Sequence, residues 1–295
     1  MASEKARVML VSPSLSSSSA PPLRQVFSDD NLWERLRQEA TEVLAREPVL
    51  ATLILTTVIN RDTFEEAVIH RIALRLANGT VSTDLIIDAF TAALRDDPGI
   101  GKAFRADIAA VVDRDPATAR LIEPLLYYKG FHAIETHRLA HYLWNTNQRD
   151  LAFYLQSRSS ELFQTDIHPA ARFGRGIFLD HATGFVVGET TEIEDNVSVL
   201  QNVTLGGTGK QIGDRHPKIK RGTLIGAGAK ILGNIEVGPC ARVAAGSVVL
   251  NPVPANMTVA GVPAKIIGTA GCPEPARDMD QILSKLAYDS FSYSI

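Results

Sequence analysis

The chain has 295 residues, enough to bury a sizeable core and to form two domains. Its net charge of −3 and the lack of a long basic block argue against nucleic-acid binding, and no run of about 18 apolar residues predicts a membrane span. The two cysteines, Cys240 and Cys272, lack metal-ligand spacing. These features are typical of a cytoplasmic protein in a reducing compartment.

Residues 1–27 form the first segment, which is rich in serine and contains three prolines. It lacks the apolar stretch and the cleavage pattern of a secretory signal. We interpret this segment as a disordered extension, and a transit peptide is the alternative.

Residues 28–165 are predicted to be all-helical. Apolar spacing and capping residues predict helices that start near residue 29 and then cover 49–59, 64–76, 82–94, 102–112, 116–126, 129–145 and 149–163. Taken alone, Asp115 is a helix cap before Pro116. His137 and His141 fall on one helical face, which would suit a metal. Because their neighbours are apolar core positions, we interpret them and His132 as structural or surface histidines.

Residues 166–268 repeat every six positions, and this period is the strongest signal in the chain. Bulky apolar residues recur in three series with a constant period: Ile167, Phe173 and Leu179; Val187, Ile193, Val199 and Leu205; Ile219, Ile225, Ile231, Val237, Val243 and Val249. The phase slips by two residues after Leu179, and the non-repeating run 206–218 separates the last two series. Neither a helix nor simple strand alternation has this period, which is typical of a hexapeptide β-helix. Run 206–218 is therefore expected to project as a loop.

Seven motifs in this region, together with the helical segment before it, carry a resemblance to a known family. They are DIHPAA at 166–171, LDHATG at 179–184, VGET at 187–190, VTLGGTGK at 203–210, GDRHPK at 213–218, IGAGAKILGNI at 225–235 and AGVPAK at 260–265. Over residues 29–268 the chain resembles serine O-acetyltransferases. The resemblance implies an α+β chain in which a helical domain, used for oligomerisation, precedes a left-handed parallel β-helix. It also implies acetyl transfer from acetyl-CoA to L-serine, as a step of cysteine biosynthesis.

The chemistry of that reaction needs a base for the serine hydroxyl proton. A histidine suits this role because its unperturbed pKa is about 6.5. The resemblance assigns His181 as the base and Asp166 as its carboxylate partner. A carboxylate bound to one imidazole nitrogen would fix the tautomer and stabilise the imidazolium. A surface histidine at a corner is the alternative interpretation of His181.

The substrate carries an ammonium and a carboxylate, so its pocket needs both signs of charge. The resemblance places Asp115 and Asp180 at the amino group, and Arg215 and His216, in the loop that reaches towards a neighbouring subunit, at the carboxylate. Arginine suits this position because its planar fork binds a carboxylate through two hydrogen bonds. Glu189 matches a family position near the catalytic histidine.

Binding of CoA requires a groove with accessible backbone and small side chains. The resemblance puts CoA in a cleft between two rods. The residues it suggests there are Gly207, Thr208, Ala227, Gly228 and Ala245, with Lys230 and Lys265 as candidate phosphate contacts. No permanently bound cofactor and no metal are expected.

Residues 269–295 are expected to be a flexible C-terminal tail, with a short helix near 278–286. The resemblance implies that terminal Ile295 enters O-acetylserine sulfhydrylase and that L-cysteine inhibits at the serine site. It also implies a homotrimer, and a dimer of trimers formed through the helical domains.

Three other functions compete with this interpretation. The first is acetylation of another hydroxyl acceptor, and the second is a regulatory scaffold for the sulfhydrylase. The third is a zinc carbonic anhydrase on the same rod, which needs three histidines from neighbouring coils. Only His168, His181 and His216 lie in the repeat region, and His216 falls in the loop.

Overall fold

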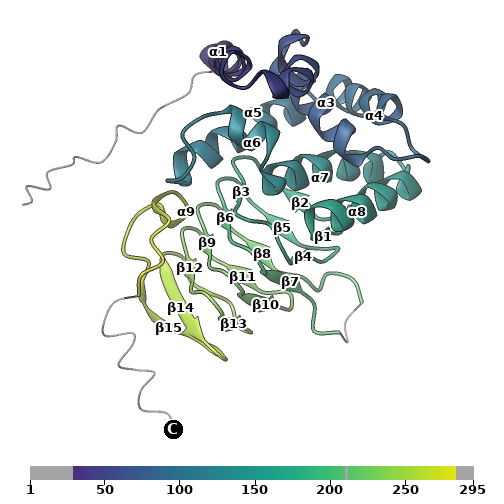
Figure 1. The fold of residues 1–295 in the computed structure, drawn as a ribbon. Coiled ribbons are helices and arrows are strands. Elements are labelled where there is room, and N and C mark those ends of the chain that lie inside the picture. The colour runs from purple at the N-terminus through teal and green to yellow at the C-terminus, as the bar shows by residue number, and fades with distance from the viewer. Residues whose placement is uncertain (1–28, 210–211, 284–295) are drawn as a thin grey trace, which may run out of the picture.

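The computed structural model describes residues 29–209 and 212–283, and Figure 1 shows a helical domain stacked on a tapering rod of short strands. The interpretations of residues 1–27 and Ile295 lie outside the described residues. No helix in the described part of the chain is long and apolar enough to cross a membrane.

The helical domain contains eight α-helices among the described residues, and their bounds follow. They are α1 (Asp29–Arg46), α2 (Ala51–Ile54), α3 (Phe64–Leu76), α4 (Thr83–Asp96), α5 (Gly99–Arg114), α6 (Ile122–Leu126), α7 (Lys129–Asn145) and α8 (Arg149–Phe163). A 3₁₀ turn η1 (Pro48–Leu50) precedes α2, and a π-helix η2 (Leu55–Ile59) follows it, so the helix expected at 49–59 has three parts.

One predicted helix is wrong over half of its length. The sequence pattern gave a helix at 116–126, but α6 begins only at Ile122. Asp115 instead ends α5, and its Oδ1 accepts the Ala117 N–H at 2.9 Å while its Oδ2 accepts the Thr118 hydroxyl at 2.6 Å. These bonds fold residues 115–118 into a turn, because an aspartate side chain competes with helical hydrogen bonds.

The rod is a left-handed parallel β-helix with three faces, as the six-residue period predicted. Face A contains β1 (Thr165–Ile167), β4 (Phe185–Val187), β7 (Thr204–Gly206), β10 (Lys230–Leu232) and β13 (Val248–Val249). Face B contains β2 (Arg172–Phe173), β5 (Glu192–Ile193), β8 (Lys218–Ile219) and β11 (Glu236–Val237). Face C contains β3 (Phe178–Leu179), β6 (Ser198–Val199), β9 (Leu224–Ile225), β12 (Arg242–Val243), β14 (Met257–Gly261) and β15 (Ala264–Thr269).

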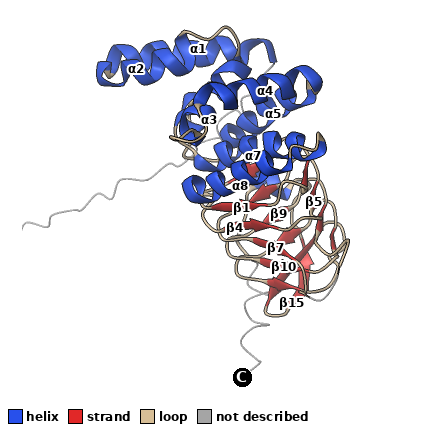
Figure 2. Ribbon diagram, turned by 90° about the vertical axis from the view of Figure 1, so that its right-hand side faces the viewer, coloured by secondary structure: helices blue, strands red, loops and turns tan. Residues whose placement is uncertain are grey.

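The strand register explains the period. Each coil crosses the three faces once, and the apolar residues of one face stack directly, as Leu179, Val199 and Ile225 do on face C. Almost every member of the three apolar series is buried, so each face contributes one aliphatic column to the core of the rod. Figure 2 shows this stack side-on below the helices.

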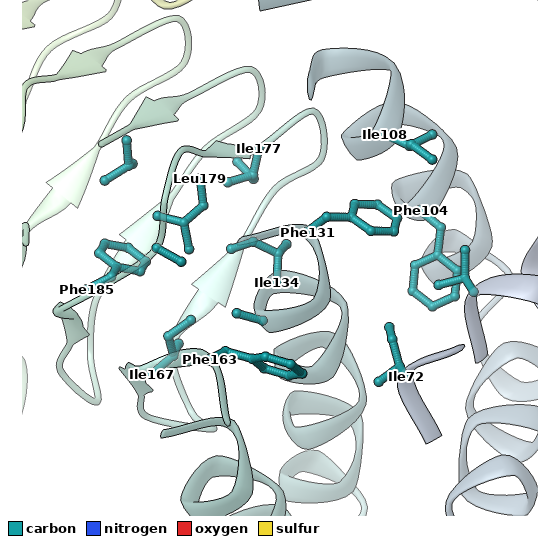
Figure 3. Close-up of a cluster of buried hydrophobic side chains, with 14 of the residues drawn as sticks. Ile72, Phe104, Ile108, Phe131, Ile134, Phe163, Ile167, Ile177, Leu179 and Phe185 are labelled. Atoms are coloured by element: carbon teal, nitrogen blue, oxygen red, sulfur yellow. The ribbon is translucent and has the colours of Figure 1, made fainter. Parts of the chain in front are cut away.

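The two domains share one core. Apolar side chains of the helices, such as Phe104, Phe131 and Phe163, belong to the same buried cluster as Ile167 and Leu179 of the first coil (Figure 3). Gly130, near the start of α7, lies so close to the rod that a Cβ atom there would stand 1.9 Å from the carbonyl oxygen of Leu179. The helical domain is therefore fixed to the end of face C, beside the corner that carries Asp180 and His181.

Beyond the rod, the structure describes residues 270–283. Residues 270–283, expected as part of a flexible tail, pack back against the rod, and α9 (Pro275–Asp278) is their only helix. The short helix expected from Asp278 is therefore displaced, since α9 ends there and residues 279–283 are not helical.

Candidate active site

The corner between faces C and A, called the C–A corner, carries His181 on a bulge. Eight positions separate Leu179 from Val187, against six between their partners in the next coil, Val199 and Leu205. The extra residues adopt left-handed backbone conformations, with φ of 56° at His181 and 60° at Ala182. Ala182 is buried, whereas the His181 side chain is 71% exposed. The phase slip in the sequence thus places an imidazole outside the rod.

Two carboxylates approach each other beside this histidine. Asp180 follows β3, and its Oδ2 lies 3.6 Å from Nε2 of His181. Partial burial raises the pKa of Asp180, and the negative charge of Asp115 raises it further, while His181 opposes the shift. Asp115 comes from the end of α5, so this anionic pair is assembled from both domains. Paired carboxylates attract a cation such as an ammonium group.

A hydroxyl chain fixes the Asp115 side chain. Thr118 Oγ1 lies 2.6 Å from Asp115 Oδ2 and 2.9 Å from the hydroxyl oxygen of Tyr128. A threonine hydroxyl has one proton, which Thr118 donates to the carboxylate, so Thr118 Oγ1 accepts a hydrogen bond from the Tyr128 hydroxyl. Asp115 therefore holds its orientation before any ligand binds.

Asp166 occupies an outward position of β1 on face A. Its Oδ1 accepts a hydrogen bond from Nε2 of Gln156 at 2.6 Å. No hydrogen bond or ion pair joins it to His181 in residues 29–209 and 212–283. The pairing of Asp166 with His181 stays a prediction.

The corner between faces A and B, called the A–B corner, carries the cationic residues. Loop 206–218, of which residues 210 and 211 are outside the description, returns to the rod here. Nη2 of Arg215 donates to Oε2 of Glu189 at 2.8 Å, and this bond lowers the pKa of the Glu189 carboxyl below its ordinary value. Arg215 is thereby held at the edge of the corner as a charged group.

Thr190 organises this corner. Its Oγ1 accepts the backbone N–H groups of Arg215, at 3.0 Å, and His216, at 3.1 Å. Its own backbone N–H donates to Nδ1 of His216 at 3.2 Å. A neutral His216 must then carry its proton on Nε2. Burial, followed by the charge of Arg215, lowers the pKa of His216 and favours this neutral form.

The absence of a side chain at Gly188 leaves the space that the His216 ring occupies. A Cβ atom at Gly188 would stand 2.0 Å from Nε2 of His216, so no larger residue fits without moving the ring. His216 is 7% exposed and packs directly over this glycine. The Nε2–H donor and the Arg215 guanidinium together suit a carboxylate.

The residues suggested for CoA divide between the two corners. Ala227, Gly228 and Ala245 stack beneath the His181 bulge on the C–A corner, where Gly228 N–H donates to Gln201 O and Gly246 N–H to Ala227 O. The close packing of small residues leaves the backbone of this corner accessible. Gly207 and Thr208 lie instead on the A–B corner, where Gly207 adjoins Arg215 and His216. One chain does not bring the two groups together.

The two candidate phosphate contacts also lie apart. Nζ of Lys230, on face A, donates to the Asn202 carbonyl oxygen at 2.5 Å, which holds its charge close to the C–A corner. Lys265 is exposed on β15, at the far end of the rod, in the antiparallel hairpin with β14. Their roles stay predictions.

The histidines of α7 are structural, as predicted. Nε2 of His132 bonds to Leu125 O at 2.7 Å, Nε2 of His137 to Ala171 O at 3.0 Å, and Nδ1 of His141 to Pro169 O at 2.8 Å. Burial lowers the pKa of His132 to about 3. No group of three or more histidine, cysteine, aspartate or glutamate side chains in the described ranges is placed to hold a metal ion.

Comparison with known proteins identifies the family. The model of the serine acetyltransferase N-terminal domain matches residues 32–136, and the model of six bacterial transferase hexapeptide repeats matches residues 216–251. The serine acetyltransferase of Haemophilus influenzae is 51% identical over 251 residues, covering 85% of this chain and 94% of that protein. The chain belongs to the serine acetyltransferase family. It is therefore an enzyme, an acyltransferase.

Solved structures of this family have the same fold. Serine acetyltransferase from Brucella abortus, in complex with coenzyme A, is 60% identical with a TM-score of 0.81 and covers 82% of this chain and 97% of that one. A serine acetyltransferase in complex with cysteine is 49% identical with a TM-score of 0.85 and covers 87% of this chain and 100% of that one. The α+β architecture expected from the sequence is confirmed.

Three supporting residues of the site were not predicted. Thr190 stands in the VGET motif, but only its contacts show that it holds loop residues 25 and 26 positions away. Thr118 and Gln156 lie in the helical domain and reach Asp115 and Asp166 through side-chain bonds. The position of Thr190 in the VGET motif could have indicated its role, whereas no sequence pattern indicated the roles of Thr118 and Gln156.

Proposed function

We propose that the chain transfers the acetyl group of acetyl-CoA to the hydroxyl of L-serine, giving O-acetyl-L-serine and CoA. The observation that carries this proposal is the division of charge on the rod. An anionic pair, Asp115 and Asp180, adjoins His181 on one corner, and Arg215 and His216 stand on another. L-serine has one charged group for each corner and a hydroxyl on the adjacent carbon.

His181 serves as the general base. It removes the serine hydroxyl proton while the oxygen attacks the thioester carbonyl of acetyl-CoA, and a tetrahedral intermediate forms. When this intermediate collapses, the C–S bond breaks and the imidazolium returns the proton to the CoA sulfur. Asp166 is the proposed partner of His181, and the carboxylate of Asp180, 3.6 Å away, adds to the stabilisation of the imidazolium.

Serine lies between the two corners. Asp115 and Asp180 bind its ammonium group, Arg215 and His216 bind its carboxylate, and Glu189 keeps Arg215 oriented. Because the two corners flank face A of one rod, we infer that each site combines the C–A corner of one copy with the A–B corner of another. Three copies close such an arrangement into a ring, which supports a homotrimer.

CoA extends along the same cleft. Gly207 and Thr208 of one copy would face Ala227, Gly228 and Ala245 of its neighbour, with Lys230 and Lys265 as candidate phosphate contacts. The relative solved in complex with coenzyme A supports CoA binding by this chain. No permanently bound cofactor is part of the proposal.

Regulation and partners follow from the shape of the substrate. L-cysteine carries the same ammonium and carboxylate as serine, so we infer that it inhibits at this site, and a relative solved with cysteine supports this. We further propose that Ile295 docks into O-acetylserine sulfhydrylase, that two trimers join through their helical domains, and that the enzyme is cytoplasmic.

The decisive experiment measures thiol release from acetyl-CoA with L-serine as acceptor. We expect serine-dependent release in the wild type and a loss of about 10²- to 10⁴-fold in His181→Ala, the range for a missing general base. His70→Ala is the matched control, because His70 is a half-buried helical histidine bonded to Arg61. Folded wild-type protein that releases no thiol with serine would contradict the proposal, and other hydroxyl acceptors would then be screened.

A further inference from the structure

Face C of the rod is covered on its outside, unlike the other two faces. Its outward residues form one column of paired positions, and all five are buried: Phe178, Ser198, Leu224, Arg242 and Thr258. None of the outward strand residues of faces A and B is buried: Asp166, Val186, Arg172 and Glu236 are exposed, and the others are half-buried. The cover consists of α5 and of residues 270–283, called the strap, which runs from the end of β15 towards the helices (Figure 1).

The strap is bonded to the rod at several levels. The Ser198 hydroxyl donates to the carbonyl oxygen of Ala276 at 2.6 Å, and the Ala276 N–H donates to Gly222 O at 3.2 Å. Lower down, Nη1 of Arg242 donates to the carbonyl oxygen of Asp280 at 3.0 Å. These bonds place α9 beside β9 and directly against α5.

An ion pair then joins the strap to the helical domain. The guanidinium of Arg277 donates to both carboxylate oxygens of Asp113, from Nε at 2.8 Å and from Nη2 at 3.2 Å. The Asp113 side chain is 17% exposed and that of Arg277 is 39% exposed. Two parallel bonds of this kind fix orientation as well as distance.

The next residue of α5 is bonded directly to the rod. Arg114 is 8% exposed, and its guanidinium donates to Ser198 Oγ at 3.0 Å and to Asn196 Oδ1 at 3.3 Å. The last turn of α5 is thus bonded to the strap through Asp113 and to the rod through Arg114. Asp115 follows immediately and ends the helix.

This attachment has a clear electrostatic reason. Asp115 and Asp180 repel each other, which contributes to the raised pKa of Asp180. Two carboxylates stay together only if the elements that carry them are held in place. Asp180 is fixed by strand β3, whereas Asp115 depends on the end of a helix from another domain.

We propose that Arg277 and Asp113 form a clasp that positions Asp115 for the amino group of the substrate. The proposal rests on the serine acetyltransfer proposed above and adds two positioning residues to it. Neither residue touches the substrate: both act through the last turn of α5. The strap therefore supports the serine site from outside it.

The test compares steady-state constants for both substrates. In Arg277→Ala and in Asp113→Asn we expect the KM for L-serine to rise about three- to tenfold, the range for loss of a partly buried ion pair. The KM for acetyl-CoA and the kcat should stay within about twofold of the wild-type values, because neither His181 nor the residues proposed to bind CoA are changed. Arg277→Lys keeps the positive charge but cannot form the two parallel hydrogen bonds. Its KM for L-serine should therefore lie between that of the wild type and those of the other two variants.

A charge exchange separates the clasp from ordinary destabilisation. Asp113→Arg and Arg277→Asp should each raise the serine KM, and the double variant should recover most of the loss. A cavity of about 440 Å³ beside the pair gives the exchanged side chains room. Arg95→Ala is the control, since Arg95 forms an ion pair with Asp96 at 3.1 Å at the end of α4, outside both α5 and the strap.

Two outcomes would overturn the clasp. One is a serine KM within about twofold of the wild type in Arg277→Ala and Asp113→Asn. The other is a parallel loss of kcat and of affinity for both substrates that the charge exchange does not recover, which would mean a general loss of structure. A wild type without serine-dependent thiol release would instead reject the proposed function itself, so the two failures are distinguishable.

Discussion

The C–A and A–B corners of the same rod carry opposite charges and are built in different ways. The C–A corner takes its second carboxylate, Asp115, from a helix of the other domain, and hydroxyls and the end of α5 hold it there. The A–B corner takes Arg215 and His216 from a loop that folds back onto Gly188 and Thr190. One corner depends on the packing of two domains, and the other depends on a single insertion.

This contrast shows how a repetitive fold acquires a specific site. The aliphatic columns fix the spacing of the corners but carry no charge. Each charge comes from a departure from the repeat: the two-residue slip that forms the His181 bulge, the inserted loop, or the added helical domain. An amino acid, with its opposite charges at one carbon, fits where two such departures face each other.

The largest expected effect comes from mixing two inactive variants. His181→Ala disables the C–A corner and Arg215→Ala disables the A–B corner. If each site combines corners of two copies, co-refolded mixtures at equal amounts should recover about a quarter of wild-type activity, since that share of random interfaces pairs two intact corners. Thiol release before and after co-refolding measures the recovery.

A mixture of His181→Ala with Asp115→Ala provides the control. Both residues belong to the same corner, so no interface in the mixture contains an intact C–A corner, and activity should not rise above the average of the two variants measured separately. Recovery in this control, or none in the first mixture despite trimer formation, would mean that the corners do not pair between copies.

A smaller effect is expected from a single methyl group on the A–B corner. In Gly188→Ala the new Cβ would overlap Nε2 of His216, so the ring must move and the carboxylate contact is lost. The KM for L-serine should rise about tenfold, which is the loss of about one good hydrogen bond to a charged group. Gly79→Ala is the control, because nothing lies within 4 Å of a Cβ there. An unchanged serine KM would show that His216 does not recognise the substrate.

The sequence predicted the rod well because its period follows from geometry. Every coil turns one apolar residue per face towards the core, so Ile193 must stack between Phe173 and Ile219, whatever else surrounds them. The phase slip marked the unusual corner at His181. Most of the helices were also predicted, since their amphipathic spacing and caps act locally, as the Ser82 side chain does at the Leu85 N–H.

Contacts between side chains and distant parts of the chain could not be predicted from local sequence patterns. The helix expected at 116–126 was wrong before Ile122, because the Asp115 side chain bonds to Ala117 and Thr118 and folds them into a turn. The attachment of residues 270–283 rests on side chains such as Ser198 and Arg242, which a repeat pattern assigns only to an outward face. The approach of Asp115 to Asp180 depends on how two domains pack, which no spacing within either domain encodes.

The smallest expected effect concerns pH and separates the two corners directly. The pKa of Asp180 is raised by burial and by Asp115, so Asp180 loses its charge at a higher pH than an ordinary aspartate. Serine affinity should therefore weaken on acidification as the ammonium site is neutralised. Asp115→Asn weakens binding overall, but it removes a negative neighbour that raises the pKa of Asp180, so the acid limb should move to lower pH.

Glu189→Gln is the matched change on the A–B corner. It removes a carboxylate whose pKa is already lowered by Arg215, and Glu189 is not among the groups that shift Asp180. The acid limb should therefore stay where it is in the wild type, even if affinity falls through the loss of Arg215 orientation. Calorimetric titration with L-serine, repeated from neutral pH down to about pH 5, measures the acid limb of serine binding in each variant. Equal shifts in the two variants would mean that net charge, and not the Asp115–Asp180 pair, sets the acid limb of serine binding.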